Sequence, residues 1–313
     1  MKQAHSLIIG TRASPLAQLQ GRLIKKTIEK SGFKGSISFV HFETKGDRLL
    51  DVPLQGFGGK GLFTMEIERA LSNGAIDLAV HSLKDMALQS PDDLTVCAYS
   101  KREDPRDCFI SPHFSLMSQI PSGGIIGTAS LRRQAFLAHL NPGLAFTLIR
   151  GNVETRLAKV VTENMAGTIL SYAGLKRLGL EVHAQELLSL ETMVPAPGQG
   201  VLAVQCRKDR TDLCALGNAI TVPEVALCVQ AERTVLDVLG GNCHTPLGAY
   251  CVLEGGQLKL HVKLGHPSGQ CIFSAIEQGP AHNPHAVGMM AAKEILKNLP
   301  QGLPAWLKAS PAE

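Results

Sequence analysis

The chain has 313 residues, of which 44% are hydrophobic, so it can bury sizeable cores and is long enough for two or three domains. Its 31 Lys and Arg are offset by 27 Asp and Glu, and only 4% of its residues are aromatic. This balance argues against a nucleic-acid partner. The apolar run in MKQAHSLIIGTR is too short for a secretory signal, and no run approaches a membrane span, so we expect a cytosolic protein without a membrane partner.

The cysteine spacing gives no sign of a metal or redox motif. Eight cysteines lie at positions 97, 108, 206, 214, 228, 243, 251 and 271, and no two of them form a Cys-x-x-Cys pair. In a reducing compartment most of these thiols should be free and buried. We therefore expect no metal site and no disulfide framework.

The first 220 residues alternate between strand and helix patterns. Strand patterns occur at Leu7–Ile9, Ile37–His41, Ile76–Val80, Leu94–Ala98, Gly124–Ile126, Ala145–Ile149, Thr168–Leu170 and Val201–Gln205. Helix patterns occur at Pro15–Lys30, Phe63–Leu71, Leu131–His139, Val153–Thr162 and Ala173–Leu178. This alternation is typical of βαβ units and predicts parallel or mixed sheets with helices on their faces.

Two hydrophilic junctions marked by proline divide this α/β region. They are KREDPRD at 101–107 and PAPGQG at 195–200, and the segment between them has strands and helices of its own. Because the strand at 201–205 follows the second junction directly, we expect the chain to return there to the first sheet. We predict α/β domain 1 at residues 1–102 with 200–219 and α/β domain 2 at 103–199, joined by hinge segments.

Beyond residue 220 the pattern changes. Thr221 and Pro223 are expected to begin a helix, whose apolar residues fall on one stripe. That stripe consists of Val225, Cys228, Val229, Leu236 and Leu239. Three alternating strands and a helix near Ala286–Lys297 follow. We predict a small α+β third domain at residues 220–313.

Arginines gather where predicted strands turn into helices. They are Arg12, Arg132, Arg133, Arg150 and Arg156, with Ser14, Ser130 and Asn152 as candidate helix N-caps. In open α/β sheets the carboxyl ends of the strands line the ligand crevice, and helix N-termini point unpaired N–H groups into it. Guanidinium groups bind carboxylates and phosphates through paired hydrogen bonds. The set predicts an anion-binding crevice, although a solvated surface position is an equal alternative for any single arginine.

A carboxylate follows the strand Ile76–Val80 at the same crevice, in the run His81-Ser82-Leu83-Lys84-Asp85. Nearby cations favour the ionised form of a carboxylate, so Asp85 is suited to hold a developing positive charge. A helix-capping or salt-bridged aspartate is the alternative, which the spacing alone favours.

The run Gly56–Gly61 matches the pattern Gly-x-Gly-x-x-Gly, but its context does not fit a nucleotide site. No clean strand precedes it, and Lys60 is followed by glycine instead of serine or threonine. The longer stretch Gly46–Gly61 predicts a glycine-rich lid over the cleft, with an ordinary surface loop as an equal alternative.

Nine runs in consistent order from residue 10 to residue 250 together resemble the porphobilinogen deaminase family. They are GTRASPLA at 10–17, FGGKGLFT at 57–64, AVHSLKDM at 79–86, EDPRD at 103–107, GTASLRRQ at 127–134, RGNVETRL at 150–157, AGLKRLGL at 173–180, PGQG at 197–200 and GGNCHTPLGAY at 240–250. The resemblance implies an enzyme of tetrapyrrole biosynthesis, which joins four porphobilinogen molecules head to tail into hydroxymethylbilane and releases ammonia. It also implies a monomeric cytosolic protein, whose first two domains are like periplasmic binding proteins and whose dipyrromethane cofactor is held by a cysteine thioether.

The resemblance also implies residue roles. Asp85 would be catalytic and Cys243 would carry the cofactor covalently. The other cofactor-binding residues would be Lys84, Ser130, Arg132, Arg133, Arg150, Gly151 and again Asp85. The substrate-binding residues would be Arg12, Ser14, Lys60, Arg150, Arg156, Arg177 and Gln199. No metal is implied. The ring acetates and propionates suit the arginines, and Asp85 suits the cation left when ammonia departs.

Four positions depart from the family pattern, namely Gly56, Ala87, Ala129 and Asn242. None of them is Arg12, Asp85 or Cys243, so the activity expected from the resemblance stands. Taken without the resemblance, Cys243 would be read as an inert core thiol. A non-catalytic anion-binding module built on the same clamp is the competing hypothesis, and it would need neither Asp85 nor a modified cysteine.

Overall fold

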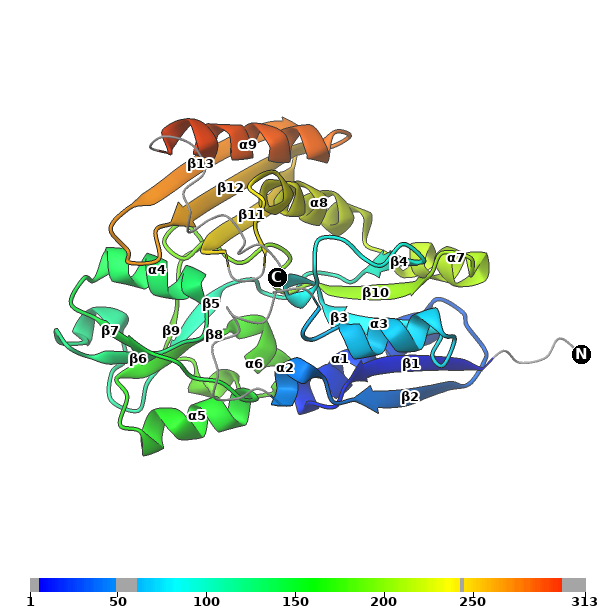
Figure 1. Ribbon diagram of the computed structural model, residues 1–313, viewed down its shortest axis with the longest axis horizontal. Helices are drawn as coiled ribbons and strands as arrows, with labels where there is room; N and C mark the ends of the chain where they lie inside the picture. The colour runs from blue at the N-terminus through cyan, green and yellow to red at the C-terminus, as the bar shows by residue number, and fades with distance from the viewer. Residues whose placement is uncertain (1–5, 49–60, 243–244, 300–313) are drawn as a thin grey trace, which may run out of the picture.

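Three sheets follow one another through the protein, each with its own helices (Figure 1). The structure is a computed structural model that describes residues 6–48, 61–242 and 245–299. Two of the sheets are α/β and the third is a small antiparallel sheet with two helices, which confirms the predicted fold class.

The first sheet has the strand order β2-β1-β3-β10-β4. Its strands β1, β2 and β3 run parallel, whereas β10 lies antiparallel between β3 and β4. The strands are β1 (Leu7–Arg12), β2 (Ile37–Phe42), β3 (Leu78–Ser82), β4 (Leu94–Tyr99) and β10 (Leu202–Arg207), and the helices are α1 (Pro15–Lys30), α2 (Lys45–Arg48), α3 (Met65–Ser72) and α7 (Thr211–Ile220). The pairing of β10 confirms the predicted return of the chain to this sheet.

The second sheet has the order β7-β6-β8-β5-β9. Strand β6 runs parallel to β7 and β8, whereas β5 runs antiparallel to β8 and β9. The strands are β5 (Asp107–Ile110), β6 (Ile125–Gly127), β7 (Ala145–Thr147), β8 (Gly167–Ser171) and β9 (Glu186–Leu187). The helices are α4 (Leu131–Leu140), α5 (Val153–Thr162) and α6 (Tyr172–Leu178), with single 3-10 turns at η3 (Met117–Gln119) and η4 (Glu181–His183). The sequence patterns miss β5 and β9.

The three predicted N-caps are confirmed. The side chains of Ser14, Ser130 and Asn152 accept hydrogen bonds from the backbone N–H three residues further on, at 3.3, 3.4 and 2.7 Å. These caps start α1, α4 and α5 shortly after β1, β6 and β7 end. Each is worth about 1 kcal/mol, and together they fix the strand-to-helix turns that carry the predicted arginines.

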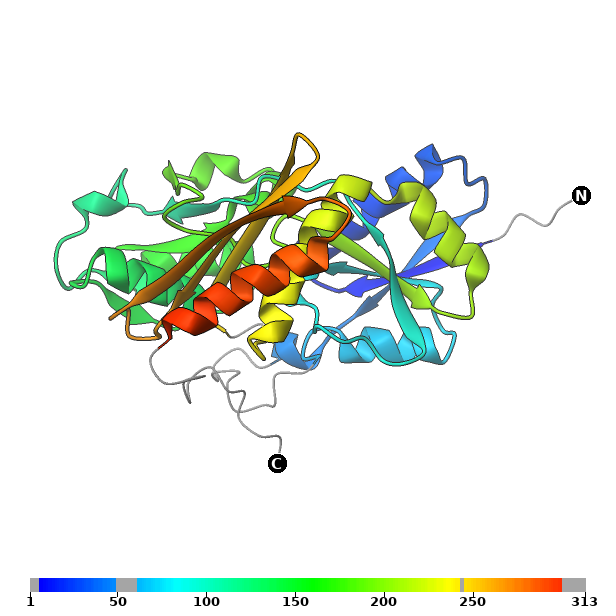
Figure 2. The same ribbon diagram turned by 90° about the horizontal axis from the view of Figure 1, so that it is seen from above.

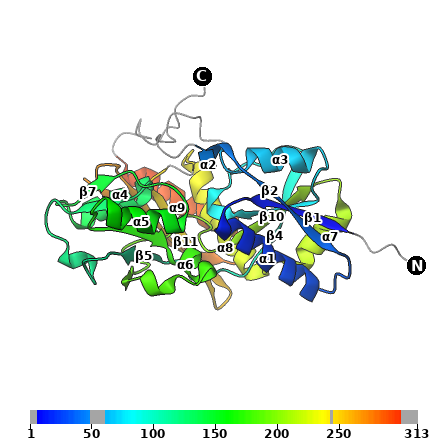
Figure 3. The same cartoon turned by 90° about the horizontal axis from the view of Figure 1, so that it is seen from below.

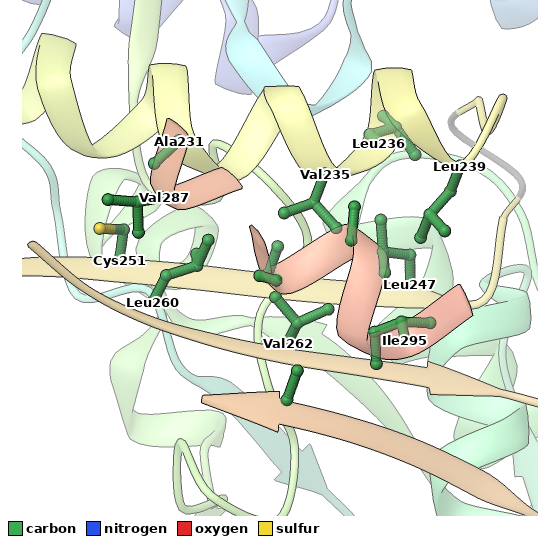
Figure 4. Close-up of a cluster of buried hydrophobic side chains, with 14 of the residues drawn as sticks. Ala231, Val235, Leu236, Leu239, Leu247, Cys251, Leu260, Val262, Val287 and Ile295 are labelled. Atoms are coloured by element: carbon green, nitrogen blue, oxygen red, sulfur yellow. The ribbon is translucent and has the colours of Figure 1, made fainter. Parts of the chain in front are cut away.

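The third sheet is an antiparallel meander covered on one face by two helices (Figures 1 and 2). Its elements are α8 (Pro223–Val238), β11 (Leu247–Glu254), β12 (Gln257–Gly265), β13 (Ile272–Pro280) and α9 (Pro284–Asn298). Figure 4 shows side chains of α8, such as Val235 and Leu239, facing Val262 and Ile295 in the core between helices and sheet.

Two predictions about α8 need correction. The helix begins after Val222, and the hydroxyl of Thr221 instead donates to the carbonyl of Gly217 at 3.0 Å, closing α7. Its apolar residues also face two cores and not one. Cys228 packs within the third domain, whereas Val229 packs beside Leu83 of the first. Helix α8 therefore anchors the third domain against the first.

The crossovers between the first two sheets meet α8 at one buried carboxylate. Glu232 of α8 is fully buried and accepts hydrogen bonds from Arg102 at 2.6 Å, from the Gly198 N–H at 2.8 Å and from the Cys251 N–H at 2.9 Å. Arg102 and Gly198 belong to the two predicted hinge segments, so all three parts of the chain join here. Farther along the boundary between the first two domains, α1 contacts α6 (Figure 3).

The membership of strands in the three sheets supports the division at 1–102 with 200–219, 103–199 and 220–313, which remains our proposal.

All seven cysteines within the described residues are free, and five of them are buried. Across the same residues, no group of three or more His, Cys, Asp or Glu side chains is placed to hold a metal ion. No single described helix is long and apolar enough to cross a membrane. Helices α7 and α8 have the necessary length and hydrophobicity only when they are taken together, and the angle between them is 102°.

Candidate active site

A short turn after β3 places two of the predicted site residues. The 3-10 turn η2 (Leu83–Asp85) follows β3 directly. Its first residue, Leu83, is fully buried and donates its backbone N–H to the carbonyl of Val201 at 3.0 Å. Because this apolar anchor fixes the turn, Lys84 and Asp85 are presented at two different hollows.

Asp85 lines the first hollow together with Arg12 and Ser14, so the structure brings these three predicted residues together. The hollow is open to solvent and holds about 420 Å³ of space. Its wall also includes Phe63 and His81, which the sequence did not single out for a role. The Asp85 carboxylate accepts no hydrogen bond from the described residues, so it can receive a donor from a ligand.

Arg12, which lines this hollow, already pairs with a carboxylate of the protein. Its guanidinium lies 4.4 Å from the centre of the Phe63 ring and pairs with Asp47, with Nε 3.3 Å from Oδ2. Burial raises the pKa of Asp47, but the hydrogen bond and charge of Arg12 outweigh it and the net shift is downward. Sequence reasoning missed Asp47. Asp47 occupies part of the Arg12 guanidinium, and the role of Arg12 in substrate binding stays a prediction.

The second hollow, of about 480 Å³, is lined from all three domains. Lys84 comes from the first, Ser130 and Arg132 from the second, and Asn242 and Thr245 from the third. Asn242 and Thr245 flank the predicted cofactor anchor, Cys243, which itself lies outside the described residues. Three predicted cofactor-binding residues therefore meet beside the segment that would carry the cofactor.

The surroundings of Arg132 and Arg133 differ from those that the sequence predicted. Both side chains are buried and pair with one carboxylate. Arg132 Nη2 lies 2.6 Å from Asp107 Oδ2, and Arg133 Nη2 lies 2.8 Å from Asp107 Oδ1. Their Nη1 atoms donate to the carbonyls of Val194 and Ile169 at 2.7 and 2.8 Å. The sequence predicted that both would face a ligand, and it gave Asp107 no role. With two guanidinium groups and one carboxylate, the group keeps a net positive charge.

The surroundings of Asp107 hold its pKa well below the usual range. Burial alone would raise the pKa, but the charges of Arg132 and Arg133 outweigh that effect. Each arginine keeps one buried atom, Nε, without a partner among the described residues. An unpaired buried donor is costly.

Gln199 connects this group to Lys84. It is fully buried, and its Nε2 donates to Asp107 Oδ1 at 2.9 Å and to the carbonyl of Pro105 at 2.7 Å. Its Oε1 accepts from Lys84 Nζ at 3.2 Å. Gln199 lines neither hollow. The structure thus places this predicted substrate-binding residue where it positions Lys84 and the hinge.

Arg150, Arg156 and Gly151 lie together at the start of α5. Arg156 Nε donates to the carbonyl of Gly151 at 2.9 Å, and Gly151 has a φ of +117°, a conformation that favours glycine. Burial lowers the pKa of Arg156 to about 10, with a further contribution from Arg133, while Asp85 opposes the shift. Burial also lowers the pKa of Arg150. Arg156 therefore lies within the electrostatic reach of Asp85, and Arg150 lies within that of Arg156.

Arg177 is not part of this group. Its Nη2 donates to the carbonyl of Gly200 at 2.6 Å, in the second hinge segment. Burial lowers its pKa to about 10, and the charge that opposes the shift is that of Glu103 in the first hinge segment. Lys60 and most of the predicted lid, Gly46–Gly61, lie outside the described residues.

Lys84 should titrate near pH 8. Burial lowers its pKa to about 8; Asp85 and Asp107 oppose this shift, and Arg133 and Arg132 add to it. Keeping the half-buried Lys84 protonated in the folded protein then costs stability below pH 8, and this cost is relieved as the pH rises from about 8 towards the usual 10.5. NMR of the protein labelled at lysine Cε and free of bound pyrrole measures the midpoint, with Lys84→Arg to identify the signal. A midpoint above pH 10 would contradict this description of the site.

Comparison with known proteins identifies the family. A model described as porphobilinogen deaminase, dipyromethane cofactor binding domain, matches residues 7–215, and one described as porphobilinogen deaminase, C-terminal domain, matches residues 226–297. The chain belongs to the porphobilinogen deaminase family. The porphobilinogen deaminase of Chromobacterium violaceum is 41% identical over 93% of this chain and 94% of its own length, and that of Thiobacillus denitrificans is 40% identical over 98% and 100%. The resemblance predicted from the nine sequence runs is confirmed.

Solved structures of binding proteins are similar at low identity. A nutrient-binding protein from Burkholderia cenocepacia bound to methionine matches with a TM-score of 0.44 and 12% identity, over 69% of this chain and 90% of its own. A periplasmic binding protein of Salmonella typhimurium with high arginine specificity matches with a TM-score of 0.41 and 13% identity, over 69% and 91%.

Proposed function

We propose that this chain is a porphobilinogen deaminase, a transferase that joins four porphobilinogen molecules head to tail into hydroxymethylbilane and releases ammonia at each addition. The observation that carries the proposal is the place of the Lys84–Asp85 turn. Asp85, without a hydrogen-bond donor among the described residues, lines a hollow with Arg12, and Lys84 lines a second hollow beside the residues that flank Cys243. An anion-binding module would need the cations but not this carboxylate.

The second hollow fits a dipyrromethane cofactor, as the dipyromethane-binding family model implies. Such a group carries acetates and propionates on two pyrrole rings, and the hollow offers the ammonium of Lys84, the hydroxyl of Ser130 and the guanidinium of Arg132. Arg132 still has one buried donor, Nε, without a partner. We propose that these residues hold the cofactor and that Cys243 carries it. When bound, the cofactor supplies the pyrrole α-carbon to which the first substrate unit is joined.

In the first hollow, Arg12 and Ser14 would bind a ring carboxylate of the incoming porphobilinogen. That contact would place the aminomethyl group and the pyrrole N–H beside Asp85, which lines the same wall. Arg150 and Arg156 would bind carboxylates of units already joined, since Arg156 lies within the electrostatic reach of Asp85 and Arg12, and Arg150 lies within that of Arg156. The arginines orient the substrate and hold no proton that the reaction needs.

Asp85 would have two roles, to stabilise the positive charge of the ring and to remove the proton of the α-carbon. When ammonia leaves the aminomethyl group, positive charge develops on the ring, and a carboxylate that accepts the pyrrole N–H stabilises that charge. After the new carbon–carbon bond forms, the α-carbon of the preceding ring must lose its proton. Asp85 is the carboxylate of this hollow and can take that proton.

Turnover tests the proposal. The purified protein should consume porphobilinogen, release one ammonia for each molecule consumed and yield a linear tetrapyrrole. Binding of porphobilinogen without its consumption would instead support the anion-binding module.

We also propose that the protein acts as a monomer in the cytosol; the free thiols among its described residues support a reducing compartment.

A further inference from the structure

Arg233 of α8 binds the backbone just beyond the Lys84–Asp85 turn. Its Nη2 donates to the carbonyl of Ala87 at 2.6 Å and to that of Leu88 at 3.0 Å. Arg233 is partly buried, burial lowers its pKa, and it forms no salt bridge within the described residues. A partly buried guanidinium that binds backbone oxygens instead of a carboxylate is costly, so its place needs an explanation.

One face of α8 follows the turn and the segment after it. Val229, four residues before Arg233, belongs to one buried cluster with Leu83, the first residue of the turn, and with Met86, the residue after it. Residues four apart lie on the same face of a helix, so Val229 and Arg233 face the same way. Helix α8 therefore packs on the apolar ends of the turn with Val229 and binds its exit with Arg233.

The turn itself is short and has little to hold it closed. Its own backbone supplies one hydrogen bond, from the Met86 N–H to the carbonyl of Leu83 at 3.1 Å, and such 3-10 bonds have poor geometry. Burial of Lys84 also favours an open turn, because the ammonium ion would regain water. The bond from Leu83 to Val201 fixes the entry of the turn, so the exit is the end that can open. Arg233 binds that end.

The same helix leads to the second hollow. Arg233 lines that hollow, and so do Asn242 and Thr245, which lie shortly after α8 ends and flank the predicted cofactor anchor. Arg233 does not line the first hollow, where Asp85 lies. Its two bonds therefore connect the third domain to the turn that serves both hollows.

We propose that Arg233 is a positioning residue, which holds the exit of the Lys84–Asp85 turn from the third domain and so keeps Asp85 at the first hollow. This inference rests on the proposed function and adds a residue that acts through the turn and not on the substrate. Loss of Arg233 should loosen the turn and slow the chemistry, because small displacements of a reacting group are costly. Binding of substrate at the first hollow should change little.

Hydrogen exchange of the full-length holoenzyme reports on the turn without depending on turnover. In Arg233→Met, which removes the donors and keeps an unbranched side chain, exchange should become about tenfold faster or more in the peptide that contains residues 83–88. Exchange in β12, the central strand of the third sheet, should stay as in the wild type. Equal exchange of residues 83–88 in wild type and Arg233→Met would overturn the proposal. So would equal acceleration in that peptide and in β12, since it would assign Arg233 to the general stability of the third domain.

Kinetics separate positioning from binding. Arg233→Met should lower kcat about tenfold or more and change the KM for porphobilinogen by less than about threefold. Arg233→Lys keeps the charge and an N–H donor, and it should recover part of kcat. Arg22→Met, at an exposed position in α1, is the control and should leave both constants unchanged. A higher KM with an unchanged kcat would assign Arg233 to substrate binding and overturn the proposal. Loss of the covalent cofactor with unchanged exchange at residues 83–88 would assign it to cofactor binding and do the same.

The backbone at Ala87 offers a rescue that needs no arginine. Met86 is extended, with φ −83° and ψ 141°, as the residue before a proline must be. Among the described residues other than glycine only Asn164 has a positive φ, so that of Ala87 is negative, and the Ala87 N–H donates no hydrogen bond to them. Adding Ala87→Pro to Arg233→Met should therefore restore slow exchange and most of kcat, because the proline ring fixes φ where Arg233 held the carbonyl. Slow exchange in this double variant with kcat no higher than in Arg233→Met would contradict a role through the turn.

The two proposals can fail separately. If the wild-type protein does not consume porphobilinogen, the proposed function fails, and hydrogen exchange still tests the hold of Arg233 on the turn. If the wild type turns over normally and Arg233→Met keeps wild-type exchange and kcat, only the positioning role fails. Thermal unfolding of each variant checks that it is folded; should Arg233→Met unfold early, Arg233→Gln serves as the second variant without a guanidinium.

Discussion

Asp85→Asn should remove nearly all turnover and leave a folded protein. The side chain lines an open hollow and accepts no hydrogen bond from the described residues, so its amide analogue costs the fold little. A neutral amide cannot stabilise the positive charge that develops when ammonia leaves, and it cannot take up the α-proton. We expect kcat to fall by about 10³-fold or more, measured as ammonia release, with an unchanged circular dichroism spectrum.

A nearby aspartate provides the control for this variant. Asp92 is exposed on the loop before β4, and Asp92→Asn should keep wild-type turnover. Ammonia release by Asp85→Asn within a few-fold of the wild-type rate would remove Asp85 from the chemistry and favour the anion-binding module.

Asp107→Asn should cause the largest loss of stability among the site variants. Asp107 is fully buried and pairs with Arg132 and Arg133, which are 4% and 6% exposed. Removing its charge leaves two buried guanidinium ions without a counter-ion, which costs about 3–5 kcal/mol in comparable buried pairs. Urea unfolding at pH 7 measures the difference. Cofactor content should fall as well, because Arg132 lines the second hollow.

The pH dependence of this difference has a definite sign. Because the folded protein holds the pKa of Asp107 below the usual 3.8, its contribution to the free energy of unfolding is fully present above about pH 4 and is lost as the pH falls through the folded-state pKa. Wild type and Asp107→Asn should therefore converge in stability towards low pH. Asp209→Asn is the control, since Asp209 pairs with Arg207 at the surface and its side chain is 71% exposed. Equal losses from Asp107→Asn and Asp209→Asn would refute this description of the buried group.

Local signals were sufficient to predict much of the fold. The capping residues Ser14 and Asn152 mark the starts of α1 and α5, and hydrophobic periodicity gives both helices their full observed length. Strand β5 was missed because all four of its residues are buried, so its sequence has no alternation of apolar and polar residues. The Thr221 error has a similar origin, since a hydroxyl before Pro223 fits a helix start but here closes the preceding helix.

Within the site, the sequence predicted which residues meet but not all of their partners. The rule that ligands bind at strand ends places Arg12, Ser14 and Asp85 together, and the structure has them on one wall. The pairing of Asp107 with Arg132 joins β5 to α4 across 25 residues, and that of Arg12 with Asp47 spans 35. Such pairs depend on how the elements pack, which charge and spacing along the chain do not specify.

The covalent cofactor is the central claim, and intact-mass spectrometry of the purified protein tests it most directly. We predict that the chain is heavier than its sequence by two porphobilinogen units less two ammonias, and that peptide mapping places the addition on the segment Gly241–Pro246. A thiolate is the soft nucleophile that can form the thioether, so Cys243→Ser should lose most of the adduct, while Cys228→Ser and Cys251→Ser should keep it. An unmodified mass from an active preparation, or an adduct on another cysteine, would contradict the account.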